Sequence, residues 1–503
     1  MDYDVAVIGA GIGGVTAAYF LAQEGKRVIL FERGPRVGGY ATTFKRKGFT
    51  FESSIHCVDD LADDGDFATL LADSGLWQKV TCLPAKSFAR VIYPEHDFIL
   101  DGSKDTLFSY FKSTFPEQSK NFDRLSSALD RFYAQFDTFR DSRIPDWINF
   151  LLAPLRFPSF LSLSKKTVEE YLSAYITDAK ARALFANFWH FLGLTPSQLS
   201  AFFFFLAFRG YYCDKPHYIQ GGFSRLLEGM VEGIKVKGGQ VRFNTSVSSI
   251  ISEDQRANGV LTEAGECFFV PAIISNVNAL DTLTKMPIEE SIKKNYLAKL
   301  TSIEKSISGV QVYLGLSVPA ASLGMNSPMF FVNATYDHDA TFACATREDY
   351  EHCLLEIVDH AQIDSTLAPV GKGTLAIMTC DLYEHWATLP RHEYEVKKEA
   401  VGRKLIERVE RLLPGLSKAI EVIEVATPLT MERYTRAPSG ALYGFAATVD
   451  QVGPRRLDRK TKMKGLYLAG AWTQPGHGAH ACFLSGYLAA QEVCTFLGSK
   501  KRF

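Results

Sequence analysis

The segment Val5-Ala6-Val7-Ile8-Gly9-Ala10-Gly11-Ile12-Gly13-Gly14 decides the fold of this chain. The four apolar residues before the first glycine predict a buried strand, and the alanine-rich stretch after Gly14 predicts a helix. Val28-Ile29-Leu30-Phe31 then predicts a second buried strand, which ends at Glu32. A strand, a glycine turn, a helix and a strand that ends in an acid are typical of a dinucleotide-binding unit.

Each part of this pattern has a physical task. Gly9 permits a tight turn, Gly11 lets the backbone approach a pyrophosphate, and Gly14 lets the helix pack close to the sheet. The pyrophosphate rests at the helix N-terminus, where free N–H groups favour an anion. Glu32 follows the glycines by roughly twenty residues, where a carboxylate accepts hydrogen bonds from a ribose. A chance glycine loop does not account for the strand, the helix and the acid together, so the sequence predicts a bound dinucleotide.

A second glycine pair follows the acid, in Arg33-Gly34-Pro35-Arg36-Val37-Gly38-Gly39-Tyr40-Ala41-Thr42. It offers another close approach of backbone to phosphate, and Arg33 adds a charge-assisted donor. Taken alone, this segment is equally a loop with solvated arginines.

The C-terminal region favours FAD over NAD. Gly465–Gly470 is a short apolar strand that ends in glycine, followed by the loop Ala471-Trp472-Thr473-Gln474-Pro475-Gly476-His477-Gly478-Ala479-His480 and a last helix from Ser485. These features indicate that the chain end returns to close the cofactor site. A long flavin needs such contacts beyond its AMP half.

These motifs, with two further blocks, resemble the phytoene desaturase superfamily, which includes carotenoid desaturases, carotenoid isomerases and animal retinol saturase. The further blocks are 218–226, continuing to Ile273-Ile274-Ser275-Asn276, and 427–435 with 443–445. The resemblance implies an FAD-dependent oxidoreductase or isomerase that acts on the C–C double bonds of a long apolar isoprenoid or polyene. One departure concerns Ala471, which stands where many such flavoproteins carry an aspartate to the ribityl chain.

The fold that the resemblance implies is an α/β, Rossmann-type FAD-binding domain joined to a substrate domain of mixed sheet plus helices, with an amine oxidase-like architecture. We expect residues 1–70, 216–285 and 420–503 to form the discontinuous FAD-binding domain. Residues 71–215 are expected to form a helical, membrane-facing lid, and residues 286–419 the mixed-sheet part of the substrate domain. Within the first domain, Asn258-Gly259 is expected in a turn-rich stretch before a hairpin strand.

Composition excludes several classes of protein. The 503 residues carry a net charge of −1, so no global field attracts nucleic acid. Nine cysteines without a CxxC spacing indicate free thiols in a reducing compartment and neither a metal site nor a disulfide framework. The first strand begins close to Tyr3, which leaves no room for a signal peptide, so we expect a cytoplasmic protein.

Two apolar segments, 147–161 and 201–208, suggest contact with a membrane or with an apolar substrate. Both are shorter than the roughly 20 residues of a spanning helix. The phenylalanine run of the second is either a buried helix or the wall of an apolar tunnel. The first, which has prolines and lies near Lys165-Lys166, is the better candidate for an in-plane membrane contact. We therefore expect a peripheral protein on the cytoplasmic membrane face, of undetermined oligomeric state.

No hydrolase triad, HExxH motif or P-loop is visible, so the chemistry is assigned to the flavin. His56, His477 and His480 are the catalytic candidates, because an imidazole moves the proton that accompanies hydride transfer. The alternative is that these loop histidines satisfy backbone groups. An amine oxidase-like enzyme with a soluble substrate, and a flavin- or lipid-binding protein without turnover, remain alternative functions. The predicted cofactor-binding residues are Gly9, Gly11, Ile12, Gly13, Gly14, Glu32, Arg33, Gly38, Gly39, Tyr40, Ala41, Thr42, Val247, Asn276, Gly470, Ala471, Gly476 and Gly478.

Overall fold

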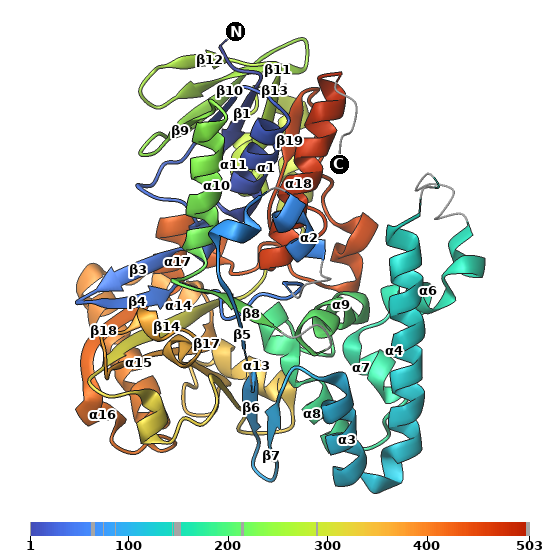
Figure 1. Ribbon diagram of the computed structural model, residues 1–503, viewed down its shortest axis with the longest axis vertical. Helices are drawn as coiled ribbons and strands as arrows, with labels where there is room; N and C mark the ends of the chain where they lie inside the picture. Colours follow the sequence, from blue (N-terminus) through green and yellow to red (C-terminus); the bar gives the residue numbers. More distant parts are fainter. Residues whose placement is uncertain are drawn as a thin grey trace.

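The computed structural model describes residues 2–61, 66–73, 75–85, 87–142, 144, 152–212, 216–287 and 290–498. Its upper half in Figure 1 is built on a five-stranded sheet in the order β19-β13-β1-β2-β9, in which all pairs are parallel. Three separated parts of the sequence therefore meet in one sheet. The strands are β1 (Val5–Ile8), β2 (Val28–Phe31), β9 (Gln240–Arg242), β13 (Ala272–Ser275) and β19 (Leu466–Leu468).

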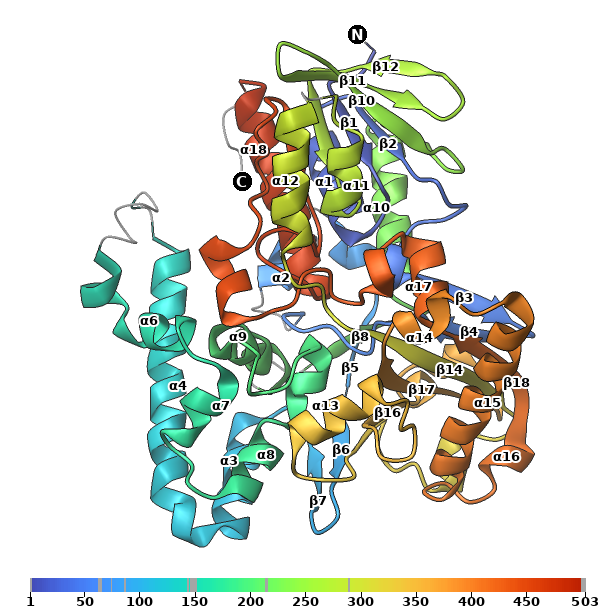
Figure 2. The same ribbon diagram turned by 180° about the vertical axis from the view of Figure 1, so that it is seen from behind.

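Both faces of this sheet are covered, which explains why its strands are apolar throughout. Val5 and Val7 point to one face and pack in a core with three helices, and Ala6 and Ile8 point to the other face. The helices on the first face are α1 (Ile12–Gln23), α10 (Ser224–Val236) and α18 (Ala479–Phe496). The second face carries the antiparallel strands β10 (Val247–Glu253), β11 (Arg256–Thr262) and β12 (Cys267–Phe269), with α11 (Ala279–Thr284) and α12 (Glu290–Thr301), as Figure 2 shows.

The lower half contains a seven-stranded mixed sheet in the order β18-β14-β17-β16-β15-β6-β7. Neighbouring strands run antiparallel except β15 and β6, which are parallel. The strands are β6 (Ala89–Ile92), β7 (Asp97–Leu100), β14 (Ser308–Leu316), β15 (Met329–Val332), β16 (Leu355–Val358), β17 (Gly373–Asp381) and β18 (Ile420–Ala426). One face packs against a core that includes α13 (His338–Thr346), α14 (Glu384–Ala387) and α15 (Arg391–Glu410).

A helical region packs against the other face of this sheet through a core rich in phenylalanine. Its longest helix, α4 (Ser119–Arg140), buries Phe122, Leu125 and Leu129 along one side, at the helical spacing that the sequence shows. The remaining elements of the region are α3 (Lys104–Thr114), α6 (Pro158–Ser164), α7 (Val168–Ser173), α8 (Ala179–Phe185), the short helix η4 (Asn187–Leu192) and α9 (Ala201–Tyr212).

The seven-stranded sheet takes strands from parts of the chain that were expected elsewhere. The hairpin β6–β7 lies in the segment expected to be helical, and β18 lies at the start of the last expected FAD-binding piece. Both strands are fixed by partners far away in sequence, since β6 pairs with β15 and β18 pairs with β14. Because distant partners fix these short strands, their own sequences show little of the hydrophobic pattern that predicts a strand.

Two expectations concern the chain as a whole. In the part of the chain that the structure describes, no helix has the length and apolar character needed to cross a lipid bilayer. Eight cysteines in that part are free thiols, and Cys213 lies outside the described residues. Residues 147–151 of the apolar segment 147–161 also lie outside them.

Candidate functional site: a cavity above the parallel strands

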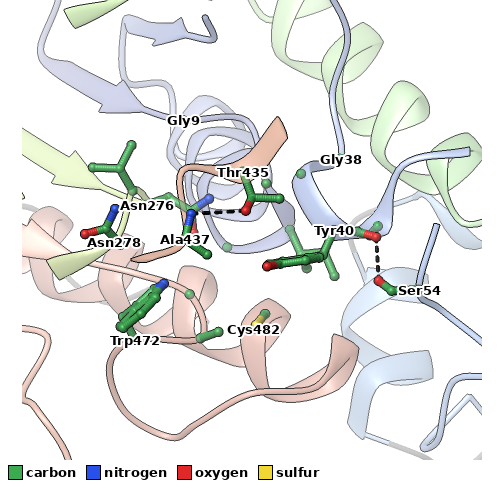
Figure 3. Close-up of a pocket in the computed structure, with 18 of the residues that line it drawn as sticks. Gly9, Gly38, Tyr40, Ser54, Asn276, Asn278, Thr435, Ala437, Trp472 and Cys482 are labelled. Carbon is green, nitrogen blue, oxygen red and sulfur yellow. Dashed lines mark hydrogen bonds between the residues drawn. The ribbon is translucent and has the colours of Figure 1, made fainter. Parts of the chain in front are cut away.

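A cavity of about 290 Å³ opens at the carboxyl ends of the parallel strands. Ile8, Phe31 and Asn276, at the ends of β1, β2 and β13, line it together with Gly470, which follows β19. Figure 3 shows side chains from these segments and from the C-terminal loop around the same space. Ligands of open α/β sheets bind at this edge, where the strand order reverses.

The two glycine turns pack against each other at one wall of the cavity. The N–H of Gly38 donates to the carbonyl of Ala10 at 2.9 Å, and Gly11 and Gly38 form a parallel bridge. Gly9 has a φ of +91°, which a side chain would strain. The structure thus places both predicted glycine motifs beside one space, as a single site for the two phosphates requires.

Asn276, labelled in Figure 3, lies close to three glycines that line the cavity. A Cβ atom on Gly13 would lie 2.7 Å from its Oδ1, and a Cβ on Gly470 would lie 2.4 Å from the same oxygen. A Cβ on Gly11 would lie 2.8 Å from its Nδ2. The start of α1 therefore approaches the segments that follow β13 and β19 closely, because these positions have no side chain.

Charged groups gather in one part of the cavity. Glu32 accepts hydrogen bonds from the N–H groups of Ala10 at 2.8 Å and of Gly34 at 2.7 Å. Arg33 donates to the backbone carbonyls of the segment 433–434, and burial lowers its pKa. Asp281, Lys285 and Arg436 line the cavity with them. Such a mixture of N–H groups, cations and carboxylates suits a diphosphate and a ribose.

The other part of the cavity is aromatic and holds His477. This imidazole is buried between the rings of Phe203 and Tyr443, whose centroids lie 4.6 and 4.9 Å away. Burial and the nearby charge of Arg456 lower its pKa well below the ordinary value, so the ring is neutral. Both ring nitrogens lack a hydrogen-bond partner among the described residues.

His56 lines the same part of the cavity and is hydrogen-bonded to a buried carboxylate. Its Nε2 lies 3.1 Å from Oε2 of Glu356, and the other carboxylate oxygen, Oε1, lies 2.7 Å from Nδ1 of His190. The rings of Phe191 and Tyr211, which also line the cavity, pack nearby. A polar cluster is therefore built into an otherwise apolar wall.

Arg456 holds the C-terminal loop without a carboxylate partner among the described residues. Its guanidinium is buried and donates to the carbonyls of Ala471, Thr473 and Phe445. Burial lowers its pKa to about 10. The methyl group of Ala471 offers no acceptor in place of an aspartate, and its backbone carbonyl accepts from Arg456.

Most predicted site residues line the cavity, and four do not. His480 faces Asp59 and Asp60 and stacks on Phe67 at 5.8 Å. Gly14 lies against the sheet, where a Cβ would be 2.0 Å from the carbonyl oxygen of Gly9. Thr42 donates to the carbonyl of Val37, and Gly476 packs on Phe203. The predicted residues that do line it are Gly9, Gly11, Ile12, Gly13, Glu32, Arg33, Gly38, Gly39, Tyr40, Ala41, His56, Val247, Asn276, Gly470, Ala471, His477 and Gly478.

Sequence reasoning missed Glu356, His190 and Arg456. Glu356 has a weak sequence signal, because it is the single charge in the apolar strand Leu355-Glu356-Ile357-Val358. His190 lies in Asn187–Leu192, among aromatic residues that hide it. Glu356 meets His56 across 300 residues of sequence and His190 across 166.

The residues present fit a bound FAD. The three glycines around Asn276 leave a cradle that any side chain would fill. The charged part of the cavity supplies donors and acceptors for the AMP half, and the buried, unpartnered nitrogens of His477 lie where a polar ring edge would satisfy them.

Comparison with known proteins agrees with this site. A family model described as flavin containing amine oxidoreductase matches residues 12–494. The chain is 26% identical to the chloroplastic prolycopene isomerase of Arabidopsis thaliana, over 99% of this chain and 84% of the relative. It is 23% identical to all-trans-retinol 13,14-reductase of Danio rerio (98% and 85%) and 23% identical to 4,4'-diapophytoene desaturase of Methylomonas sp (97% and 94%).

Solved structures share the fold. A redesigned putrescine oxidase superposes with a TM-score of 0.66 at 17% identity, covering 98% of this chain and 99% of that one. An oxidoreductase from Methanosarcina mazei gives 0.65 at 17% identity, with 96% and 98% covered.

Proposed function

Because this chain belongs to the family of flavin-containing amine oxidoreductases, we propose that it is an FAD-dependent enzyme that oxidises, reduces or isomerises the C–C double bonds of a long apolar isoprenoid or polyene. The predicted FAD cofactor, the amine oxidase-like fold and the resemblance to carotenoid desaturases, carotenoid isomerases and retinol saturase are confirmed. The identity of the substrate as a long apolar polyene or isoprenoid is the part that remains a proposal.

The observation that carries it is the character of the cavity beyond its charged part. His56, Cys57, Phe191, Tyr211, Met378, Leu442 and Tyr443 line this region. Among the described residues of this wall there is no carboxylate or ammonium group that faces the space. An uncharged, apolar chain with a conjugated system fits these rings, whereas an amine substrate needs an acidic partner or an aromatic cage open to water.

The chemistry divides between the cofactor and the chain. Bound FAD supplies two-electron redox chemistry at carbon, as a hydride acceptor or donor. The residues in the charged part hold its phosphates and ribose, and Arg456 fixes the loop that encloses it. The aromatic wall orients the chain of the substrate and excludes water, and an imidazole moves the accompanying proton.

Helix α9 contributes side chains to the wall of the cavity at only a few positions. Phe204, Phe205 and Phe208 are fully buried core residues. Phe203 of the run contacts His477, and Tyr211, further along the same helix, lines the cavity. The phenylalanine run is therefore mostly core.

Expression in a bacterium that accumulates carotenoids tests the proposal, because pigment spectra report desaturation, saturation and isomerisation together. The proposal predicts a changed pigment profile that disappears when Gly11→Val fills the cofactor cradle. An unchanged profile, together with turnover of a soluble amine by the purified protein, would favour the amine oxidase alternative. A flavin-loaded protein without any turnover would favour a binding protein.

We propose that the helical region delivers the substrate from a membrane surface. Leu155 is 84% exposed, and the exposed Lys165 lies ten residues further along the chain. An exposed apolar side chain and an exposed cation in the same segment suit an interface with anionic lipid. Co-sedimentation with anionic vesicles tests this, and Leu155→Asp should reduce the bound fraction. Equal binding of both proteins would count against this surface.

A further inference from the structure

Glu356 is a buried carboxylate that bridges two imidazoles from distant segments. It lies on β16, His56 follows β4 (Phe49–Glu52), and His190 belongs to η4. His56 is 7% exposed, His190 1% and Glu356 8%. Among the described residues these two histidines are its ion-pair partners. The cluster therefore joins the mixed sheet, the helical region and the segment after the second glycine motif.

The carboxylate stays charged in spite of its burial. Burial alone would raise the pKa of Glu356, but the charges and hydrogen bonds of His190 and His56 outweigh it and hold the pKa below its ordinary value. An ionised carboxylate only accepts hydrogen bonds, so Nε2 of His56 and Nδ1 of His190 donate to it. The remaining nitrogen of His56, Nδ1, is buried and has no partner among the described residues.

His56 and His477 differ in the charge that lies next to the imidazole. A proton on His477 would leave a buried cation next to Arg456, and its pKa is lowered accordingly. A proton on His56 is balanced by the carboxylate in direct contact. Of the two cavity imidazoles, His56 alone among the described residues has a built-in counter-ion.

We propose that Glu356 and His190 are positioning residues that hold the His56 ring at the cavity wall through its Nε2, which leaves Nδ1 as the nitrogen that exchanges a proton with a substrate carbon. The inference rests on the proposed function. A C–C single bond that becomes a double bond loses a hydride with both electrons from one carbon and a proton from the next. The hydride belongs to the flavin chemistry, the Nδ1 lone pair takes the proton, and hydrogenation reverses both transfers.

Several titratable groups around the cluster are held in their neutral forms. Burial, with the charge of His56, lowers the pKa of His360 to about 3, although its bond to the carbonyl of Ile55 opposes the shift. Burial raises the pKa values of the thiols of Cys57 and Cys380, and of the Tyr443 hydroxyl. These neighbours of the cluster are therefore uncharged near neutral pH.

Glu356→Gln tests the inference, with Asp381→Asn as matched control. Asp381 is a fully buried carboxylate on β17 that accepts from Nδ1 of His385 at 2.7 Å and does not line the cavity. We expect E356Q to keep its FAD and KM but to lose about 10²- to 10⁴-fold in kcat, with a shifted pH profile. In the hydrogenation direction, incorporation of solvent deuterium into the product should fall in parallel. D381N should change none of these.

A second readout needs no substrate. Long-range ¹H–¹⁵N NMR of the ¹⁵N-histidine-labelled holoenzyme, with His56 assigned through His56→Gln, should show a protonated Nε2 bonded to a carboxylate, and E356Q should shift it. If E356Q does not fold, His190→Gln should produce a smaller shift of the same signal. Wild-type kcat, pH profile and His56 signals in these variants would overturn the inference. A wild-type protein that converts no polyene would instead overturn the proposed function, and the NMR result would still decide the positioning of His56.

Discussion

Replacement of Gly486 by alanine tests whether the last helix closes directly onto the first glycine turn. A Cβ atom at this position of α18 would lie 2.1 Å from the carbonyl oxygen of Gly13, 2.9 Å from its carbonyl carbon and 3.0 Å from its Cα. Ordinary contacts begin near 3.4 Å, so the two helices must separate by about 1.3 Å. Backbone lies on both sides, and no rotamer change relieves the clash. Overpacking of this kind costs roughly 1–3 kcal/mol.

The displacement should also reach the cofactor, because Gly13 lines the cavity. Thermal release of flavin fluorescence measures both effects. At roughly 1 °C per kcal/mol for a chain of 503 residues, G486A should lower the midpoint by about 1–3 °C and reduce the flavin bound after purification. Gly229→Ala in α10 is the control, since its nearest neighbour would be Cδ2 of Leu76 at 3.9 Å and alanine favours the helix. A G486A protein with wild-type midpoint and flavin content would refute the packing.

Three further predictions concern the cofactor and the stability of the protein. Burial raises the pKa of Glu52 to about 8 from 4.5, so the folded state keeps a proton that the unfolded state loses. The contribution of this carboxyl group to the free energy of unfolding therefore falls as the pH rises from about 4.5 to 8. In E52Q, the free energy of unfolding measured in urea should depend less on pH across that range, and an unchanged pH dependence would contradict this. Glu32→Gln places an amide against an N–H donor of Ala10 or Gly34, so fluorescence titration should show FAD affinity reduced at least about tenfold; unchanged affinity would exclude a role for this carboxylate. Arg456→Met removes the donors to the C-terminal loop and should speed flavin dissociation, whereas an unaltered rate would show that the loop holds itself.

The parts of the fold and site that the sequence predicts are those that short segments determine. Gly9, Gly11 and Gly13 work through backbone geometry and close packing, which the motif itself encodes. The predicted position of one turn is wrong. The hairpin between β10 and β11 turns at Asp254 and Gln255, both with positive φ, and the expected turn residues 258–259 lie inside β11.

Long-range contacts explain what the sequence did not reveal. Gly259 is needed for close strand packing, because a Cβ there would lie 2.5 Å from the carbonyl oxygen of Phe268. In the same way, Glu356 looks like an isolated charge until β16 brings it between two histidines. A single sequence does not specify which residues meet across 166 or 300 positions.

Anaerobic mixing of the FAD-loaded protein with polyene-containing vesicles tests the central claim most directly, with flavin absorbance and the polyene spectrum followed together. The account predicts that the polyene spectrum changes in at least one redox state of the flavin, and that a net change in double bonds is matched by an equal change in flavin oxidation state. An unaltered polyene with both oxidised and reduced flavin, in a protein that oxidises a soluble amine, would contradict it.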